Sequence, residues 1–204
     1  MPHPTHSAGN DLSAPWPKTG TVCCCLLTAL AAMILGTGCT TGTPENLTGR
    51  LRGLSPTVSP EEAALTARTA IEYSRQLGRD FHAIPPAASF NNVLINLGLH
   101  SRGLCFQYAD DLTVKLLTLH LRTLVLNRGV AHMQTRHEHS CVVVTAVGQS
   151  FTNGIVLDAW RRGGHLVWAP VTQDKFPWKE VELIPTYRAE LQAAADQMED
   201  KERR

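Results

Sequence analysis

A cysteine, a histidine and an aspartate stand in an order that suits nucleophilic catalysis by a thiol. Cys105 follows Gly103-Leu104 and opens a helical apolar pattern. The N-terminus of a helix has unpaired N–H groups and a partial positive charge, which favour a thiolate and can bind an oxyanion. We therefore predict that Cys105 is the nucleophile, although a buried, inert cysteine is also common at a helix start.

A histidine that begins a strand is the predicted base. His139 directly precedes the apolar run that starts at Ser140, so its side chain can face a cleft at the rim of a sheet. His137 is the competing base, because it lies two residues earlier and would share the same strand face.

The predicted orienting group is Asp158, which lies inside the apolar segment 155–160. A buried carboxylate is costly unless it is paired, and a histidine N–H is a natural partner that fixes the tautomer and stabilises imidazolium. The alternative partner is Arg161 or Arg162, in a purely structural salt bridge.

The pairing of the two strands constrains this triad. If His139 faces Asp158 directly across an antiparallel pair, Val144 faces Asn153 and a broad loop spans residues 145–152. Otherwise a bulge must restore the register.

The elements that must position these residues are helices first and strands second. Ser59-Pro60-Glu61-Glu62 is typical of a helix start, and Gly78 is expected to end that helix. A short helix is expected over residues 89–99. A long helix is expected over residues 105–126, stopped by Asn127-Arg128-Gly129.

After that point the apolar period changes to that of strands. Residues 140–147, 154–160 and 165–171 read as short strands of an antiparallel sheet. The sequence therefore predicts an α+β fold in which N-terminal helices, including the long helix that carries Cys105 at its start, pack on a small sheet. The charged, Ala-rich residues 188–204 are expected to form a solvated helix or a frayed tail.

The N-terminal residues are typical of export. Residues 22–35 form a nearly continuous apolar run after Lys18, too short for a spanning helix of ~20 residues but suited to a secretion signal. The following Leu35-Gly36-Thr37-Gly38-Cys39 resembles a lipoprotein cleavage box, except that Leu35 stands one place too early. We predict a signal peptide over 1–38, a lipid on Cys39 and a flexible linker over 39–58. The alternative is an uncleaved signal anchor with an incidental cysteine.

Charge and cysteine content bear on three other functions: nucleic-acid binding, a structural disulfide and a metal site. The net charge of +1 argues against a nucleic-acid partner. Within the predicted domain, residues 59–187, the cysteines are Cys105 and Cys141, which could instead form a disulfide. A zinc site is a further alternative, because alternate residues of one strand share a face. Its ligands would be His132, His137, His139 and Cys141.

The order of cysteine, histidine and aspartate resembles the transglutaminase-like thiol enzymes, and papain-like peptidases use the same order with asparagine third. Ser140 departs from the Asn expected beside the histidine. The residues that carry the resemblance to secreted and lipoprotein members, over residues 59–178, are Gly103-Leu104-Cys105-Phe106, Asp110-Asp111-Leu112, Glu138-His139-Ser140, Val156-Leu157-Asp158-Ala159-Trp160-Arg161 and Asp174-Lys175-Phe176-Pro177-Trp178.

The resemblance implies acyl transfer on amide bonds through a thioester, without a metal or other cofactor. A peptidase or amidase acting on a peptide or protein is expected first, and a protein-glutamine transglutaminase or deamidase second. Asn92 or Asn96 would supply an oxyanion donor, and Trp160 would shield the His–Asp bond. The competing hypothesis is a non-catalytic envelope lipoprotein that retains the fold. In either case we expect the lipid on Cys39 to hold the domain in the cell envelope, at the periplasmic or extracellular side of a membrane.

Overall fold

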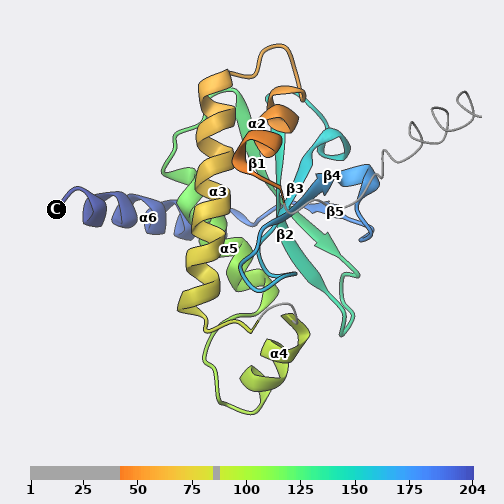
Figure 1. Ribbon diagram of the computed structural model, residues 1–204, viewed down its shortest axis with the longest axis vertical. Coiled ribbons are helices and arrows are strands. Elements are labelled where there is room, and N and C mark those ends of the chain that lie inside the picture. The colour runs from red at the N-terminus through yellow and green to blue at the C-terminus, as the bar shows by residue number, and fades with distance from the viewer. Residues whose placement is uncertain (1–41, 85–87) are drawn as a thin grey trace, which may run out of the picture. The chain divides into compact units, whose positions relative to one another are not determined.

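A five-stranded antiparallel sheet organises the part of the chain that the computed structural model describes, residues 42–84 and 88–204. The predicted α+β class is confirmed (Figure 1). In chain order the elements are α2 (Pro44–Arg52), α3 (Pro60–Asp80), α4 (Ala88–Asn96), α5 (Cys105–Leu117), β1 (Leu124–Ala131), β2 (His139–Ala146), β3 (Ile155–Asp158), β4 (Val167–Pro170), β5 (Lys179–Val181) and α6 (Pro185–Glu202), with 3-10 turns at Phe151–Asn153 and Val171–Gln173.

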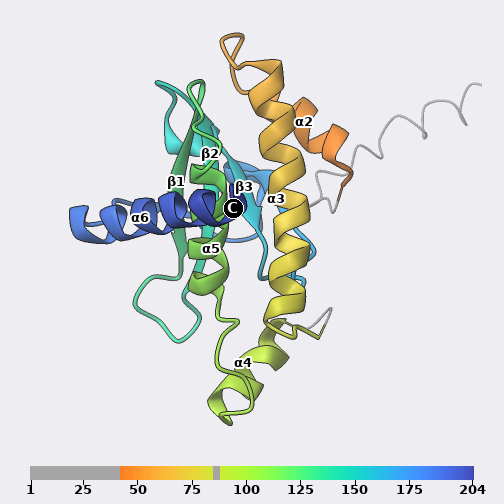
Figure 2. The ribbon, with the colours of Figure 1, turned by 90° about the vertical axis from the view of Figure 1, so that its left-hand side faces the viewer.

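The strands lie in the order β4-β3-β2-β1-β5, so β2 is central and all eight of its residues are buried. Both faces of the sheet are covered, which is why β2 is a continuous apolar run without alternation. Helices α3 and α5 pack over one face, with α2 against α3 (Figure 2). The other face is covered by side chains from the two 3-10 turns and from residues 171–178.

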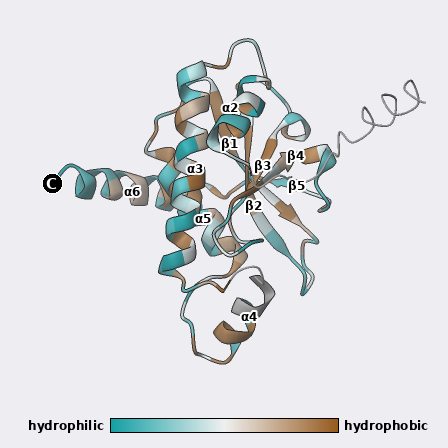
Figure 3. Ribbon diagram, viewed as in Figure 1, coloured by the Kyte–Doolittle hydropathy of each residue, from teal (hydrophilic) through white to brown (hydrophobic). Residues whose placement is uncertain are grey.

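Helix α3 begins as predicted but ends later. The Ser59 hydroxyl accepts the N–H of Glu62 at 3.2 Å, and polar and apolar residues alternate along the helix (Figure 3). Gly78 does not end the helix, which continues to Asp80. Its role is close packing, because a Cβ added at Gly78 would lie 2.6 Å from the carbonyl oxygen of Gly163.

The prediction of a long helix over residues 105–126 was wrong. Helix α5 ends at Leu117, and His120 adopts the left-handed conformation with φ of 47°. Residues 124–131 instead form β1, which pairs with β2 from Leu124↔Ala146 to Ala131↔His139. The leucines of this stretch fit both a helical and an alternating period, so pairing with β2 decided between them.

Asn127-Arg128-Gly129, expected to stop that helix, lies within β1. Glycine is needed there because a Cβ at Gly129 would lie 2.9 Å from the Sγ of Cys141 on β2.

The predicted flexible linker contains a helix, and the C-terminal segment forms the helix that was one of its two predicted alternatives. Helix α2 lies within the predicted flexible linker, and its Leu47 and Leu51 are fully buried against the helical side of the core. Helix α6 covers most of the predicted tail, and its Leu191 and Ala195 pack with Val114 of α5. Both segments looked polar overall, but each carries enough apolar residues to cover a neighbouring helix.

The register between β2 and β3 differs by two residues from the direct pairing of His139 with Asp158. Val144 faces Ile155, not Asn153, and Val142 faces Leu157. The connection between the strands is broad, as expected, and contains the turn Phe151–Asn153. Continuing the ladder places Asp158 opposite Cys141, so His139 and Asp158 are diagonal neighbours on one face of the sheet.

The predicted signal peptide, residues 1–38, and Cys39 lie outside the described residues. Within residues 42–84 and 88–204, no helix is both long enough and apolar enough to cross a bilayer.

Candidate active site

The side chains of His139 and Asp158 meet in the interior of the protein. His139 is the first residue of β2 and Asp158 is the last residue of β3. The ring nitrogen Nε2 of His139 lies 2.6 Å from Oδ2 of Asp158, and the two side chains are 3% and 0% exposed. The structure therefore contains the predicted histidine–carboxylate pair, formed by diagonal reach across the two strands.

Asp158 also has the salt bridge that was considered as the alternative to the triad. The Nε of Arg161 donates to the same Oδ2 at 2.9 Å. The backbone N–H groups of Trp160 and Arg161 donate to Oδ1 at 3.1 and 3.0 Å. Asp158 therefore makes both the predicted pair with His139 and the alternative salt bridge with Arg161. Each of its carboxylate oxygens accepts two hydrogen bonds.

These hydrogen bonds and charges determine the protonation states of His139 and Asp158. Burial raises the pKa of Asp158, but the hydrogen bond from His139 and the charge of Arg161 outweigh it and lower the pKa overall. Burial lowers the pKa of His139, but the hydrogen bond to Asp158 and the neighbouring Cys105 raise it to about 9. Around neutral pH the pair is therefore an ionised carboxylate and an imidazolium.

Aromatic rings enclose the imidazole of His139. The ring centroids of Trp160, Phe176 and Trp178 lie 4.7, 4.9 and 5.2 Å from it. The predicted position of Trp160 beside the His–Asp bond agrees with this arrangement. The three rings exclude water from the pair and keep its electrostatic interaction strong.

Helix α5, which packs on the other face of the sheet, brings Cys105 towards this pair. It is the first residue of α5 and is partly exposed. Its Sγ lies 3.7 Å from the carbonyl oxygen of Glu138, the residue before His139. The Nδ1 atom of His139 is buried and has no hydrogen-bond partner among the described residues. Cys105 is among the groups that raise the pKa of His139, so the thiol lies within interaction range of the imidazole.

The start of α5 is stabilised without using the thiol. The Gln107 side chain accepts the N–H groups of Gly103 and Leu104 at 2.7 and 3.0 Å. This interaction holds the backbone that leads into Cys105. The sulfur therefore stays available at the exposed end of the helix.

Cys141 has a different environment. It is buried in the apolar cluster on the second face of the sheet, and burial raises its pKa well above the ordinary value. Both Cys105 and Cys141 are free thiols, so the disulfide considered as an alternative is absent.

The arrangement does not support the zinc alternative. His137 lies before β2 and its Nε2 accepts from Arg136 at 3.2 Å, while the Nε2 of His139 is held by Asp158. Across the described ranges, no group of three metal-ligating side chains occurs. For the same reason His137 does not compete with His139 for Asp158.

The two asparagines predicted as oxyanion donors lie on α4. Asn92 is partly buried and its Oδ1 has no hydrogen-bond partner within the described part of the chain, whereas Asn96 is exposed at the end of the helix. Helix α4 approaches the chain before Cys105 at Gly103, where an added Cβ would lie 3.6 Å from Ile95. No contact joins either described asparagine to Cys105, so their role stays a prediction.

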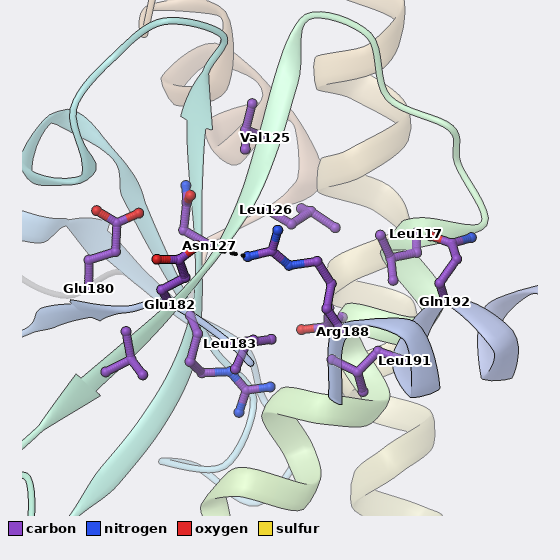
Figure 4. A pocket seen from close by; sticks show the side chains of 13 residues that line it. Leu117, Val125, Leu126, Asn127, Glu180, Glu182, Leu183, Arg188, Leu191 and Gln192 are labelled. Atoms are coloured by element: carbon purple, nitrogen blue, oxygen red, sulfur yellow. Dashed lines mark ion pairs between the residues drawn. The ribbon is translucent and has the colours of Figure 1, made fainter. Parts of the chain in front are cut away.

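A cavity of about 700 Å³ lies elsewhere, between β1, β5, α5 and α6 (Figure 4). Arg188 and Glu182 face each other across it at 3.7 Å, and apolar side chains such as Leu183 and Leu191 complete its wall. The cavity contains none of the three triad residues.

Arg161 and Asp174 are site residues whose roles were not predicted as such. The guanidinium of Arg161 joins Asp158 to Asp174, whose carboxylate lies 3.0 Å away and whose side chain is fully buried. Phe176 and Trp178 follow directly in the sequence and enclose His139. In the sequence, these residues are marked by the segment Asp174-Lys175-Phe176-Pro177-Trp178. Its contact with His139 could not be predicted, because it depends on tertiary packing.

Comparison of the chain with protein-family models, curated proteins and solved structures yields no match. The resemblance to transglutaminase-like enzymes therefore rests on the residues and their geometry.

Proposed function

We propose that this protein is a thiol enzyme that cleaves or exchanges amide bonds, with Cys105 as nucleophile, His139 as acid and base, and Asp158 as orienting carboxylate. The observation that carries the proposal is the buried His139–Asp158 pair near a cysteine that opens a helix. Within the described ranges, the second ring nitrogen of His139 has no hydrogen-bond partner. The helix start at Cys105 and the buried carboxylate beside His139 support these roles.

The reaction follows from these positions. The Cys105 thiolate attacks the amide carbonyl carbon, and the C–S bond forms as the carbonyl oxygen takes the negative charge. The N–H groups at the start of α5 are suited to bind that oxyanion. The Nδ1–H of His139 then protonates the amide nitrogen, the C–N bond breaks, and the amine leaves a thioester on Cys105.

The second half reverses the proton transfer. Neutral His139 takes a proton from water or an acceptor amine, which attacks the thioester carbonyl. The C–S bond breaks, and the sulfur leaves as thiolate beside the re-formed imidazolium. Asp158 stays ionised throughout and stabilises the charged ring.

Hydrolysis of a peptide or protein substrate is the first assignment within this class. Transfer to an amine, as in a transglutaminase, and glutamine deamidation use the same thioester and are the second. The free thiols of Cys105 and Cys141 favour an enzyme over a non-catalytic envelope module, since a disulfide would have disabled the nucleophile.

We further propose that the protein acts at the cell envelope, anchored to a membrane through a lipid on Cys39. Its near-neutral net charge gives no support to a nucleic-acid partner.

The test compares the two free cysteines. At pH 6, iodoacetamide is expected to alkylate Cys105 at least about tenfold faster than a free cysteine and to leave Cys141 unmodified. His139→Ala should remove this advantage. Cys141→Ala is the matched control and should label at the wild-type rate.

Release of amines from a peptide library then tests turnover. Cys105→Ala should abolish it while circular dichroism stays unchanged. Alkylation of Cys105 at the rate of an ordinary thiol would overturn the thiol enzyme, and a fast thiol without turnover would favour the non-catalytic module.

A further inference from the structure

Arg161 lies buried between two carboxylates at the candidate site. Its side chain is 9% exposed, and the side chains of Asp158 and Asp174 are fully buried. Its Nε donates to Oδ2 of Asp158 at 2.9 Å, and Nη2 lies 3.0 Å from Asp174. Because His139 also bonds to Oδ2, the imidazole and the guanidinium share one acceptor atom.

The same pair connects to the ring that borders the imidazole. Asp174 accepts the backbone N–H of Phe176 at 2.9 Å, and the guanidinium lies 4.8 Å from the centre of the Phe176 ring. That ring lies 4.9 Å from His139. Arg161 and Asp174 therefore hold both the carboxylate and one aromatic wall in place.

The charges around His139 come from several elements. Asp158 and Cys105 stabilise the imidazolium, whereas the positive charge of Arg161 opposes it and that of Asp174 offsets Arg161. Other titratable groups nearby are Glu138, which accepts the N–H of Gln134, His132, whose ring lies 6.0 Å from Phe176, and Lys175, whose Nζ lies 4.9 Å from that ring.

We propose that Arg161 and Asp174 are positioning residues that set how strongly Asp158 stabilises the protonated form of His139. The proposal rests on the proposed thiol chemistry, for which the imidazolium must hold a proton and yet release it. An isolated, buried Asp158 would hold the imidazolium proton too tightly for the ring to serve as a base. Because the Arg161 guanidinium shares Oδ2, Asp158 stabilises the imidazolium less strongly. The negative charge of Asp174 partly offsets this effect of Arg161.

The test is the midpoint of the His139 ring titration, followed by NMR. Arg161→Gln removes a positive charge and should raise the midpoint by about one pH unit. Asp174→Asn leaves the guanidinium uncompensated and should lower it by a similar amount. The double variant should return close to the wild-type value, and Arg161→Lys, which keeps the charge, should also stay close to it.

The alkaline limb of p-nitrophenyl acetate hydrolysis should move with the titration in each variant. Arg188→Gln is the control, because its exposed side chain pairs with Glu182 at the separate cavity, and it should move neither. If Arg161→Gln fails to fold, the downward shift in Asp174→Asn carries the test.

Two outcomes separate this proposal from the one it rests on. Shifts of the same sign in both single variants, or no shift in either, would overturn the role of Arg161 and Asp174 while Cys105 stays reactive. An ordinary Cys105 thiol in the wild-type protein would instead overturn the proposed function.

Discussion

On each face of the sheet an arginine pairs with an aspartate that also binds a third side chain, and the two third members differ. On the face covered by the 3-10 turns, Asp158 binds Arg161 and His139. On the helical face, Arg128 of β1 donates to Asp110 of α5, and Asp110 also accepts from the hydroxyl of Tyr187 on α6 at 2.5 Å.

The two networks differ in how far the pKa of the third member lies from neutral pH. Burial and the bond to Asp110 raise the pKa of Tyr187 to about 12, so this hydroxyl stays neutral. The imidazole at Asp158, with a pKa of about 9, lies much closer to neutrality and beside a cysteine. One network joins α5, α6 and β1, and the other is the one that we propose to take part in a reaction.

The largest expected contrast is between the two aspartates. Asp158→Ala should reduce turnover by about 10³-fold, because His139 loses its orientation and its charge stabilisation. Asp110→Ala should leave turnover within about twofold, since that network stabilises packing alone. Chemical denaturation should show a similar loss for both, about 3 kcal/mol, because each leaves a buried cation without its partner. Comparable losses of activity would break the comparison.

The second contrast is in the pH dependence of stability. The folded-state pKa of His139, about 9, lies above its unfolded value near 6.5, so its contribution is complete below pH 6.5 and is lost as pH rises through 9. The size of that loss is about 3 kcal/mol. Denaturation of the wild-type protein at pH 6 and pH 10 should show it, and His139→Ala should not.

Asp158 has the opposite sign. Its folded-state pKa is lowered, so its contribution is present above the ordinary carboxyl pKa and is lost as pH falls through the folded value. Acid unfolding of Asp158→Asn should therefore lack part of the wild-type pH dependence. If the stability of Asp158→Asn fell with acid in the same way as that of the wild type, another carboxylate would be responsible for the acid dependence.

The smallest effect is expected at Tyr187. Tyr187→Phe removes one hydrogen bond to Asp110 and should cost about 1 kcal/mol in thermal or chemical unfolding. The pH profile of Cys105 alkylation should not move, because the hydroxyl is remote from that site. A shifted profile would show that the two networks communicate.

The position of the candidate site could be predicted because each residue had a local signal. Cys105 stood at a helix start, His139 at a strand start and Asp158 in an apolar strand, and all three local environments are confirmed. The boundary of α5 could not be predicted, because the leucines after Leu116 fit a helix and a strand equally. Only the partner strand β2 resolved that ambiguity.

By itself, the sequence determined the class of the fold and the local settings of Cys105, His139 and Asp158, because capping residues, apolar periodicity and the cost of a buried carboxylate are local properties. The tertiary structure alone decided the two-residue register between β2 and β3, the shared Oδ2 atom and the aromatic walls from Phe176 and Trp178. These depend on contacts between segments far apart in the chain, and their geometry is set by packing that no short window of residues contains.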